Sequence, residues 1–215
     1  MGGSPRGVAG AHYGRYVALL GVLLVVVFTL HTVLGSHKGA AGLRVGSHIP
    51  PFAAPLAIGG PVGEVDVATR PNEGAAGKHP ACTVRGAGIL NICQLYEHRP
   101  VVLALFFDAG ACASVLERLQ RLAPLYPKVS FVAVAVNEDA GSVVRLVRSR
   151  RITIPVGVDA DGRLAGLYTM VSCPQIMFVA PGGLLRSAPL LSTPSDATLA
   201  ARVGQLLPSS KSTVR

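Results

Sequence analysis

Cys112 is the residue whose position in this 215-residue chain most favours chemistry. It follows an apolar run over residues 101–107 and a turn over 108–111, and it opens an apolar-periodic segment that predicts a helix. Free amide N–H groups at the start of a helix, and the positive end of its dipole, stabilise a thiolate relative to a thiol. The sequence therefore predicts a redox site whose nucleophile is the Cys112 thiolate.

The elements that must position this cysteine follow one another in a regular order. Strands alternate with helices along residues 101–107, 112–119, 129–136, 142–150 and 154–158, and after a short helix ending near 168 come strands 175–179 and 184–187 and a helix over 196–207. The alternation predicts a parallel βαβ core in an α/β domain, and the Gly-rich turn at 180–183 predicts a terminal antiparallel hairpin. Ser195 is expected to cap the last helix.

A second organising feature is the apolar stretch over residues 16–34. It is about as long as the hydrocarbon core of a bilayer, which predicts one transmembrane helix acting as an anchor. A cleaved signal peptide is the alternative, but the run is longer than a typical signal core and no Ala-x-Ala site follows directly. The expected organisation is a cytoplasmic tail, the anchor, a flexible linker, one domain and a disordered tail, at residues 1–15, 16–34, 35–42, 43–207 and 208–215.

The distribution of cysteines predicts the location of the domain. All four follow the apolar stretch, and an even count suits an oxidising compartment outside the cytoplasm. The cell membrane is therefore the expected location, with the C-terminal domain extracytoplasmic. The net charge of +9 is scattered, and a chain with few aromatic residues and no tryptophan offers little surface for base stacking. We expect no nucleic-acid partner and only a weak attraction to anionic lipid headgroups.

Three segments carry motifs that belong together. They are residues 45–52 (VGSHIPPF), residues 107–112, and residues 171–179, the last followed by a Pro-Gly-Gly turn. They resemble the opening, the approach to the active-site cysteine and the cis-proline strand of the redoxin family, the TlpA-like and peroxiredoxin-like thiol proteins. The resemblance runs from about residue 43 to 207. It implies a thioredoxin fold, a cis peptide bond before Pro174, protein thiols or disulfides outside the cytoplasm as partners, and no bound cofactor.

The chain also departs from that family at the expected site. Ala111 stands where a tryptophan is usual, and Val115 stands where the second cysteine of C-x-x-C would be. We hypothesise that Cys173, which precedes the proline, replaces this cysteine, so that Cys112 attacks a substrate disulfide and Cys173 resolves the mixed disulfide. Two buried, inert cysteines, a binding module with a permanent disulfide, and a thiol peroxidase are the alternatives. The peroxidase is disfavoured because Ala109 replaces the Thr or Ser of peroxiredoxins.

Proton handling is a further point of difference. In that family a buried acidic residue near the second cysteine handles protons, and the corresponding position in this chain is Arg118. Asp108 is the alternative acid for this role.

Cys82 and Cys93 are expected to form a local structural disulfide outside the cytoplasm. Closing a loop of this length stabilises the fold by about 3 kcal/mol in the chain-entropy model. A metal site that also uses His79 and His98 is the alternative. Pro80 and the oxidising compartment argue against it, and we expect no metal.

Overall fold

The computed structural model of this protein describes residues 16–27, 43–61 and 79–207. The chain divides into two units, residues 1–40 and 41–215. In the first unit residues 16–27 are helical with exposed side chains, while residues 28–34 of the expected anchor lie outside the described residues, as do 1–15, 35–42 and 208–215. Among the helices that the structure describes, none combines the length and the apolar character needed to cross a membrane.

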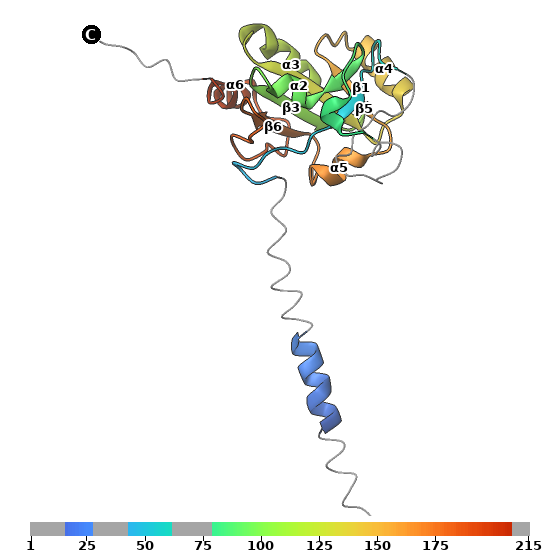
Figure 1. The fold of residues 1–215 in the computed structure, drawn as a ribbon, viewed down its shortest axis with the longest axis vertical. Helices are drawn as coiled ribbons and strands as arrows, with labels where there is room; N and C mark the ends of the chain where they lie inside the picture. Colours follow the sequence, from blue (N-terminus) through green and yellow to red (C-terminus); the bar gives the residue numbers. More distant parts are fainter. Residues whose placement is uncertain (1–15, 28–42, 62–78, 208–215) are drawn as a thin grey trace, which may run out of the picture. The chain divides into compact units, whose positions relative to one another are not determined.

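A four-stranded mixed sheet forms the centre of the second unit, in the order β5-β4-β3-β6. Its strands are β3 (Val101–Phe106), β4 (Ser130–Val136), β5 (Val156–Asp159) and β6 (Gln175–Val179). β3 runs parallel to β4, and β4 runs parallel to β5, whereas β6 runs antiparallel to β3 (Figure 1). The parallel pairs confirm the predicted βαβ core.

Helices and a small two-stranded sheet cover both faces of this sheet. The remaining elements are β1 (Ala53–Pro55), η3 (Ala81–Thr83), β2 (Ile89–Asn91), α2 (Ile92–Tyr96), η4 (Cys112–Ser114), α3 (Val115–Leu122), η5 (Ala123–Leu125), α4 (Ala140–Ser149), α5 (Arg163–Leu167) and α6 (Asp196–Gly204). Alternate residues of β3 point to opposite faces. Val102, Ala104 and Phe106 pack with α3, α4 and α6, while Val101, Leu103 and Leu105 pack with β1, β2, α2 and α5. Both faces are therefore buried, which explains the uninterrupted apolar run of β3.

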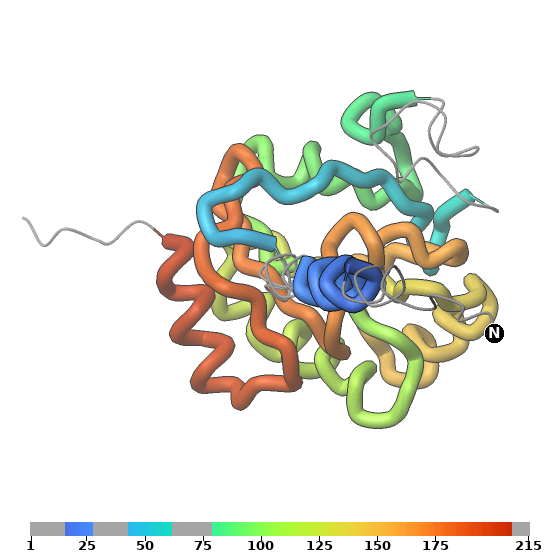
Figure 2. Tube along the Cα trace, turned by 90° about the horizontal axis from the view of Figure 1, so that it is seen from below, coloured from blue at the N-terminus to red at the C-terminus, as the bar shows by residue number. Residues whose placement is uncertain are grey.

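The segment before β1 is tied to the domain by Tyr168. The Tyr168 side chain is fully buried, its hydroxyl donates a hydrogen bond to the Pro50 carbonyl at 2.6 Å, and its ring meets the edge of Phe52 with centroids 5.9 Å apart. Burial raises the pKa of Tyr168 well above its ordinary value. Figure 2 shows the segment over residues 43–61, in cyan, running along the upper side of the domain in this view, with α6, in red, at the left.

The terminal hairpin is less regular than predicted. β6 forms as expected, but its partner is reduced to single bridges, of Leu185 with Val179 and of Leu184 with His48. The competing partner is the segment near Ser47, because the Leu185 N–H donates to the Ser47 carbonyl at 2.9 Å. The segment after β6 is therefore shared between two neighbours instead of pairing along its length with β6.

Helix boundaries follow side-chain caps. α4 begins at Ala140, two residues earlier than predicted, because the Asp139 carboxylate accepts from the N–H groups of Gly141 at 2.8 Å and Ser142 at 3.1 Å. The Ser142 hydroxyl also donates to this carboxylate. Its hydrogen bond is the main cause of the lowered pKa of Asp139, and the backbone N–H groups add to it. Ser195 caps α6 as predicted, accepting from the Thr198 N–H at 3.1 Å.

Candidate active site: the Cys112–Cys173 disulfide

Cys112 lies just beyond the carboxyl end of β3. Its N–H donates to the Ala109 carbonyl at 3.0 Å, which closes the turn after the strand. Gly110 takes a positive φ of 48° in this turn, a conformation that glycine adopts readily. Cys112 then opens the 3-10 turn η4, which leads without a gap into α3. The predicted helix start is thus present, with one tighter turn ahead of the α-helix.

The sheet register brings Cys173 to the same edge. Leu105 is opposite Gln175, so continuing the antiparallel register by two residues sets Phe107 opposite Cys173. The peptide bond between Cys173 and Pro174 is cis, as the resemblance implied. The Phe107 N–H donates a hydrogen bond to Cys173 Sγ at 3.1 Å. Cys173 Sγ therefore accepts a hydrogen bond from the first backbone N–H beyond the paired part of β3.

Cys112 and Cys173 are joined by a disulfide. They are 61 positions apart in sequence, and their Cα atoms lie 5.5 Å apart, within the usual disulfide range of about 4.4–6.8 Å. The structure thus brings together Cys112, Cys173 and Pro174. The two sulfurs differ in environment. Cys112 is only 7% exposed and belongs to the core on the α3 face, whereas Cys173 is half-buried at its edge.

A carboxylate that sequence reasoning missed supports this edge. Glu138 Oε1 accepts a hydrogen bond from the Asp108 N–H at 2.8 Å, one residue after the amide that reaches Cys173. Glu138 is half-buried and Asp108 is exposed, so the Asp108 side chain is not the buried acid considered above. Glu138 follows β4, and the carboxyl ends of neighbouring parallel strands share one edge of a sheet. That rule was the signal that could have identified it.

Arg118 belongs to a surface ion-pair group instead of the site. It donates to Asp196 at 2.9 Å, and Arg121 also contacts this carboxylate. Hydrogen bonds from Arg121 and then Arg118 lower the pKa of Asp196. This group links α3 to α6 at the protein surface.

Cys82 and Cys93 form a second disulfide, with Cα atoms 5.4 Å apart. Cys93 is 2% exposed and packs on the sheet face opposite to Cys112. Asn91 organises the surroundings of this bond. Its side chain accepts from the Gln94 N–H and donates to the carbonyls of Ala81 and Val84, each at 2.8 Å. The sheet therefore separates the two disulfides.

The metal alternative for Cys82 and Cys93 has no geometric support. Their sulfurs are bonded to each other, and the His98 side chain is 82% exposed. Within the described part of the chain, no group of three or more potential ligands is arranged to hold a metal ion.

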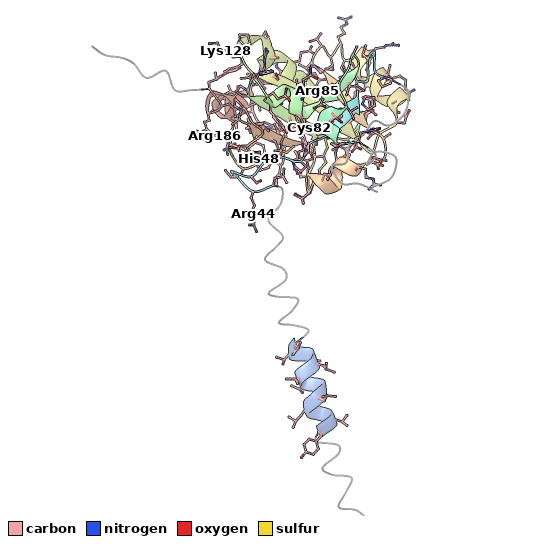
Figure 3. The ribbon with its side chains drawn as sticks, viewed as in Figure 1. Arg44, His48, Cys82, Arg85, Lys128 and Arg186 are labelled. Carbon is pink, nitrogen blue, oxygen red and sulfur yellow. A yellow bond between two sulfur atoms is a disulfide. The ribbon has the colours of Figure 1, made fainter. Side chains whose placement is uncertain are left out.

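Basic residues are distributed over the domain surface. Arg44, Arg85 and Lys128 project from separate parts of it (Figure 3), and Arg85 forms an ion pair with Glu97. This pair raises the pKa of Arg85 and lowers the pKa of Glu97.

Comparison with known proteins identifies the fold. No family model matches the chain, and no curated protein matches it. Among solved structures, a thiol:disulfide interchange protein of the thioredoxin family from Chlorobium tepidum has a TM-score of 0.56 and 13% identity over 77% of this chain and 99% of that one. Peroxidoxin BcpB from Mycobacterium tuberculosis has a TM-score of 0.54 and 15% identity over 76% and 96%. The thioredoxin domain of a thiol-disulfide oxidoreductase from Bacteroides vulgatus has a TM-score of 0.53 and 13% identity over 75% and 99%. The second unit of this chain therefore has the thioredoxin fold, as its resemblance to the redoxin family implied.

Proposed function

We propose that this chain is a membrane-tethered thiol-disulfide oxidoreductase that exchanges disulfides with protein partners outside the cytoplasm through Cys112 and Cys173. One observation carries the proposal. In a thioredoxin fold without a C-x-x-C pair, Cys173 stands opposite the end of β3 and is bonded to the cysteine that opens η4.

The chemistry needs only the two sulfurs. A partner thiolate attacks one sulfur of the disulfide, a mixed disulfide forms, and the other sulfur leaves as a thiolate. The second thiol of the partner, as its thiolate, then attacks the partner sulfur in that mixed disulfide. The partner becomes oxidised, and Cys112 and Cys173 become a dithiol that has gained two electrons and two protons. The reverse sequence reduces a partner disulfide, and neither direction requires a bound cofactor.

The proposed location rests on the cysteines and the apolar segment. Two disulfides suit an oxidising compartment, and all four cysteines follow residues 16–34. That segment is as long as a bilayer core, and its excess of branched aliphatic side chains suits a helix in contact with lipid.

Insulin reduction by the full-length chain, with dithiothreitol as electron donor, tests the exchange function. The wild type should accelerate insulin precipitation, and Cys112→Ala and Cys173→Ala should each abolish that effect. The reduction potential of the pair should lie above about −300 mV, because permanent structural disulfides lie below that value. No acceleration together with a potential below it would favour the binding module, and rapid sulfenic acid formation at Cys112 with peroxide would favour the peroxidase.

Alkaline extraction of membranes and N-terminal sequencing test the tether. The chain should stay in the membrane pellet and retain residues 16–34. A mature chain that begins after residue 34 would identify a cleaved signal peptide and refute the anchor.

A further inference from the structure

We infer that Cys173, and not Cys112, is the sulfur that forms the mixed disulfide with a partner. This inference rests on the proposed exchange function. It reverses the roles expected from sequence, in which the cysteine at the start of the helix attacks and the cysteine before the proline resolves.

Access to the two sulfurs is the first argument. A thiolate must approach the attacked sulfur from the side opposite to the leaving sulfur, along the axis of the S–S bond. Cys112 is 7% exposed and belongs to the same core cluster as Val115 and Leu116, both of which are fully buried, so a partner has little access to it. Cys173 is half-buried, and Val171, two residues before it, is 60% exposed. The open approach therefore leads to Cys173.

The Phe107 amide is the second argument. Its N–H donates to Cys173 Sγ at 3.1 Å, and a hydrogen bond to a sulfur favours its charged form. In the reduced domain this donor stabilises a Cys173 thiolate, the form that attacks a partner disulfide. Glu138 accepts a hydrogen bond from the next amide of the same turn at 2.8 Å, so the donor is kept in place by a contact from the loop after β4.

The position of Cys112 suits the complementary role. It opens η4, whose turn continues into α3, and the positive end of the dipole of such a segment stabilises negative charge. When a partner thiolate attacks Cys173, the bond between the two cysteines breaks and its electron pair leaves on Cys112. When the partner disulfide is the oxidant, the Cys173 thiolate attacks it first, and one partner sulfur leaves as a thiolate while the other stays bonded to Cys173. The Cys112 thiolate then attacks Cys173, the intramolecular disulfide forms, and the partner sulfur leaves.

Single-thiol variants of the full-length chain test this order. Cys112→Ser leaves Cys173 free and Cys173→Ser leaves Cys112 free, while both variants keep the Cys82–Cys93 disulfide. Each is mixed with excess 5,5′-dithiobis(2-nitrobenzoic acid), and the release of nitrothiobenzoate is followed by absorbance. The Cys112→Ser protein should react faster by about tenfold or more, because its thiol is accessible and hydrogen-bonded.

A measurement on the wild type avoids any effect of substitution on folding. The reduced chain is treated with substoichiometric N-ethylmaleimide, and mass spectrometry of peptides locates the label. The label should appear first on Cys173. Faster labelling of Cys112, or faster reaction of the Cys173→Ser protein, would overturn the order of attack while leaving the exchange function intact. If neither thiol exchanges with any disulfide, the proposed function itself fails.

Discussion

The Cys82–Cys93 disulfide should stabilise the domain without taking part in exchange. Replacing both residues with alanine opens a loop of 11 positions, for which the chain-entropy model gives a loss of about 3 kcal/mol. Cys93 is 2% exposed, so losing its sulfur from the core adds up to about 1 kcal/mol. The sum is smaller than the stability of many domains of this size, about 5–15 kcal/mol, so the variant should remain folded.

Urea unfolding at 25 °C without reductant, followed by circular dichroism, measures this loss. The midpoint should fall, and the dependence on urea should steepen somewhat because the unfolded chain is less restricted. Insulin reduction by the folded variant should match the wild type, since the sheet separates this bond from Cys112 and Cys173.

The matched control is the double variant Cys112→Ala and Cys173→Ala. Its opened loop spans 61 positions, for which the same model gives about 4 kcal/mol, and it should lose exchange activity entirely. A change in unfolding free energy below about 1 kcal/mol for the Cys82 and Cys93 variant would refute the entropic reasoning. A folded variant with impaired insulin reduction would show that this bond contributes to exchange.

Three further substitutions probe contacts that hold the fold. Hydrogen bonds, of which that from Arg121 is the strongest cause, lower the pKa of Asp196. The Asp196 carboxylate therefore stabilises the fold above about pH 4, and this stabilisation is lost as the pH falls through the lowered pKa. In thermal melts, Asp196→Asn should lose less stability on acidification than the wild type does. Tyr168→Phe leaves the Pro50 carbonyl without its donor and should cost about 2 kcal/mol in urea unfolding. Asp139→Ala removes the cap of α4 and should lower the urea midpoint in the same assay.

Each of these has a distinct contradicting result. An unchanged acid profile for Asp196→Asn would mean that its arginine contacts are absent in solution. Wild-type stability of Tyr168→Phe would show that water replaces the lost donor. A loss for Asp139→Asn as large as that for alanine would show that the cap does not act through side-chain acceptance, because asparagine is an equally good cap.

The order of strands and helices could be predicted from the chain because each carries a local signal. The apolar run before Cys112, the helical segment predicted over residues 112–119 and the Ser195 cap depend on neighbouring residues. The structure confirms all three, with the α-helix itself at 115–122. The second strand of the terminal hairpin could not be predicted in its real form. Its partner near Ser47 lies more than a hundred positions away, and that segment competes for its hydrogen bonds.

The sequence by itself determined that a cysteine opens the helical segment after a buried strand, and that another precedes a proline where an antiparallel strand begins. Only the tertiary structure decided that these two sulfurs meet, because their distance follows from the register of β6 on β3. It also decided which sulfur is buried and which receives the Phe107 amide. Burial and hydrogen bonding of a side chain depend on elements far apart in sequence, so local patterns of residues do not encode them.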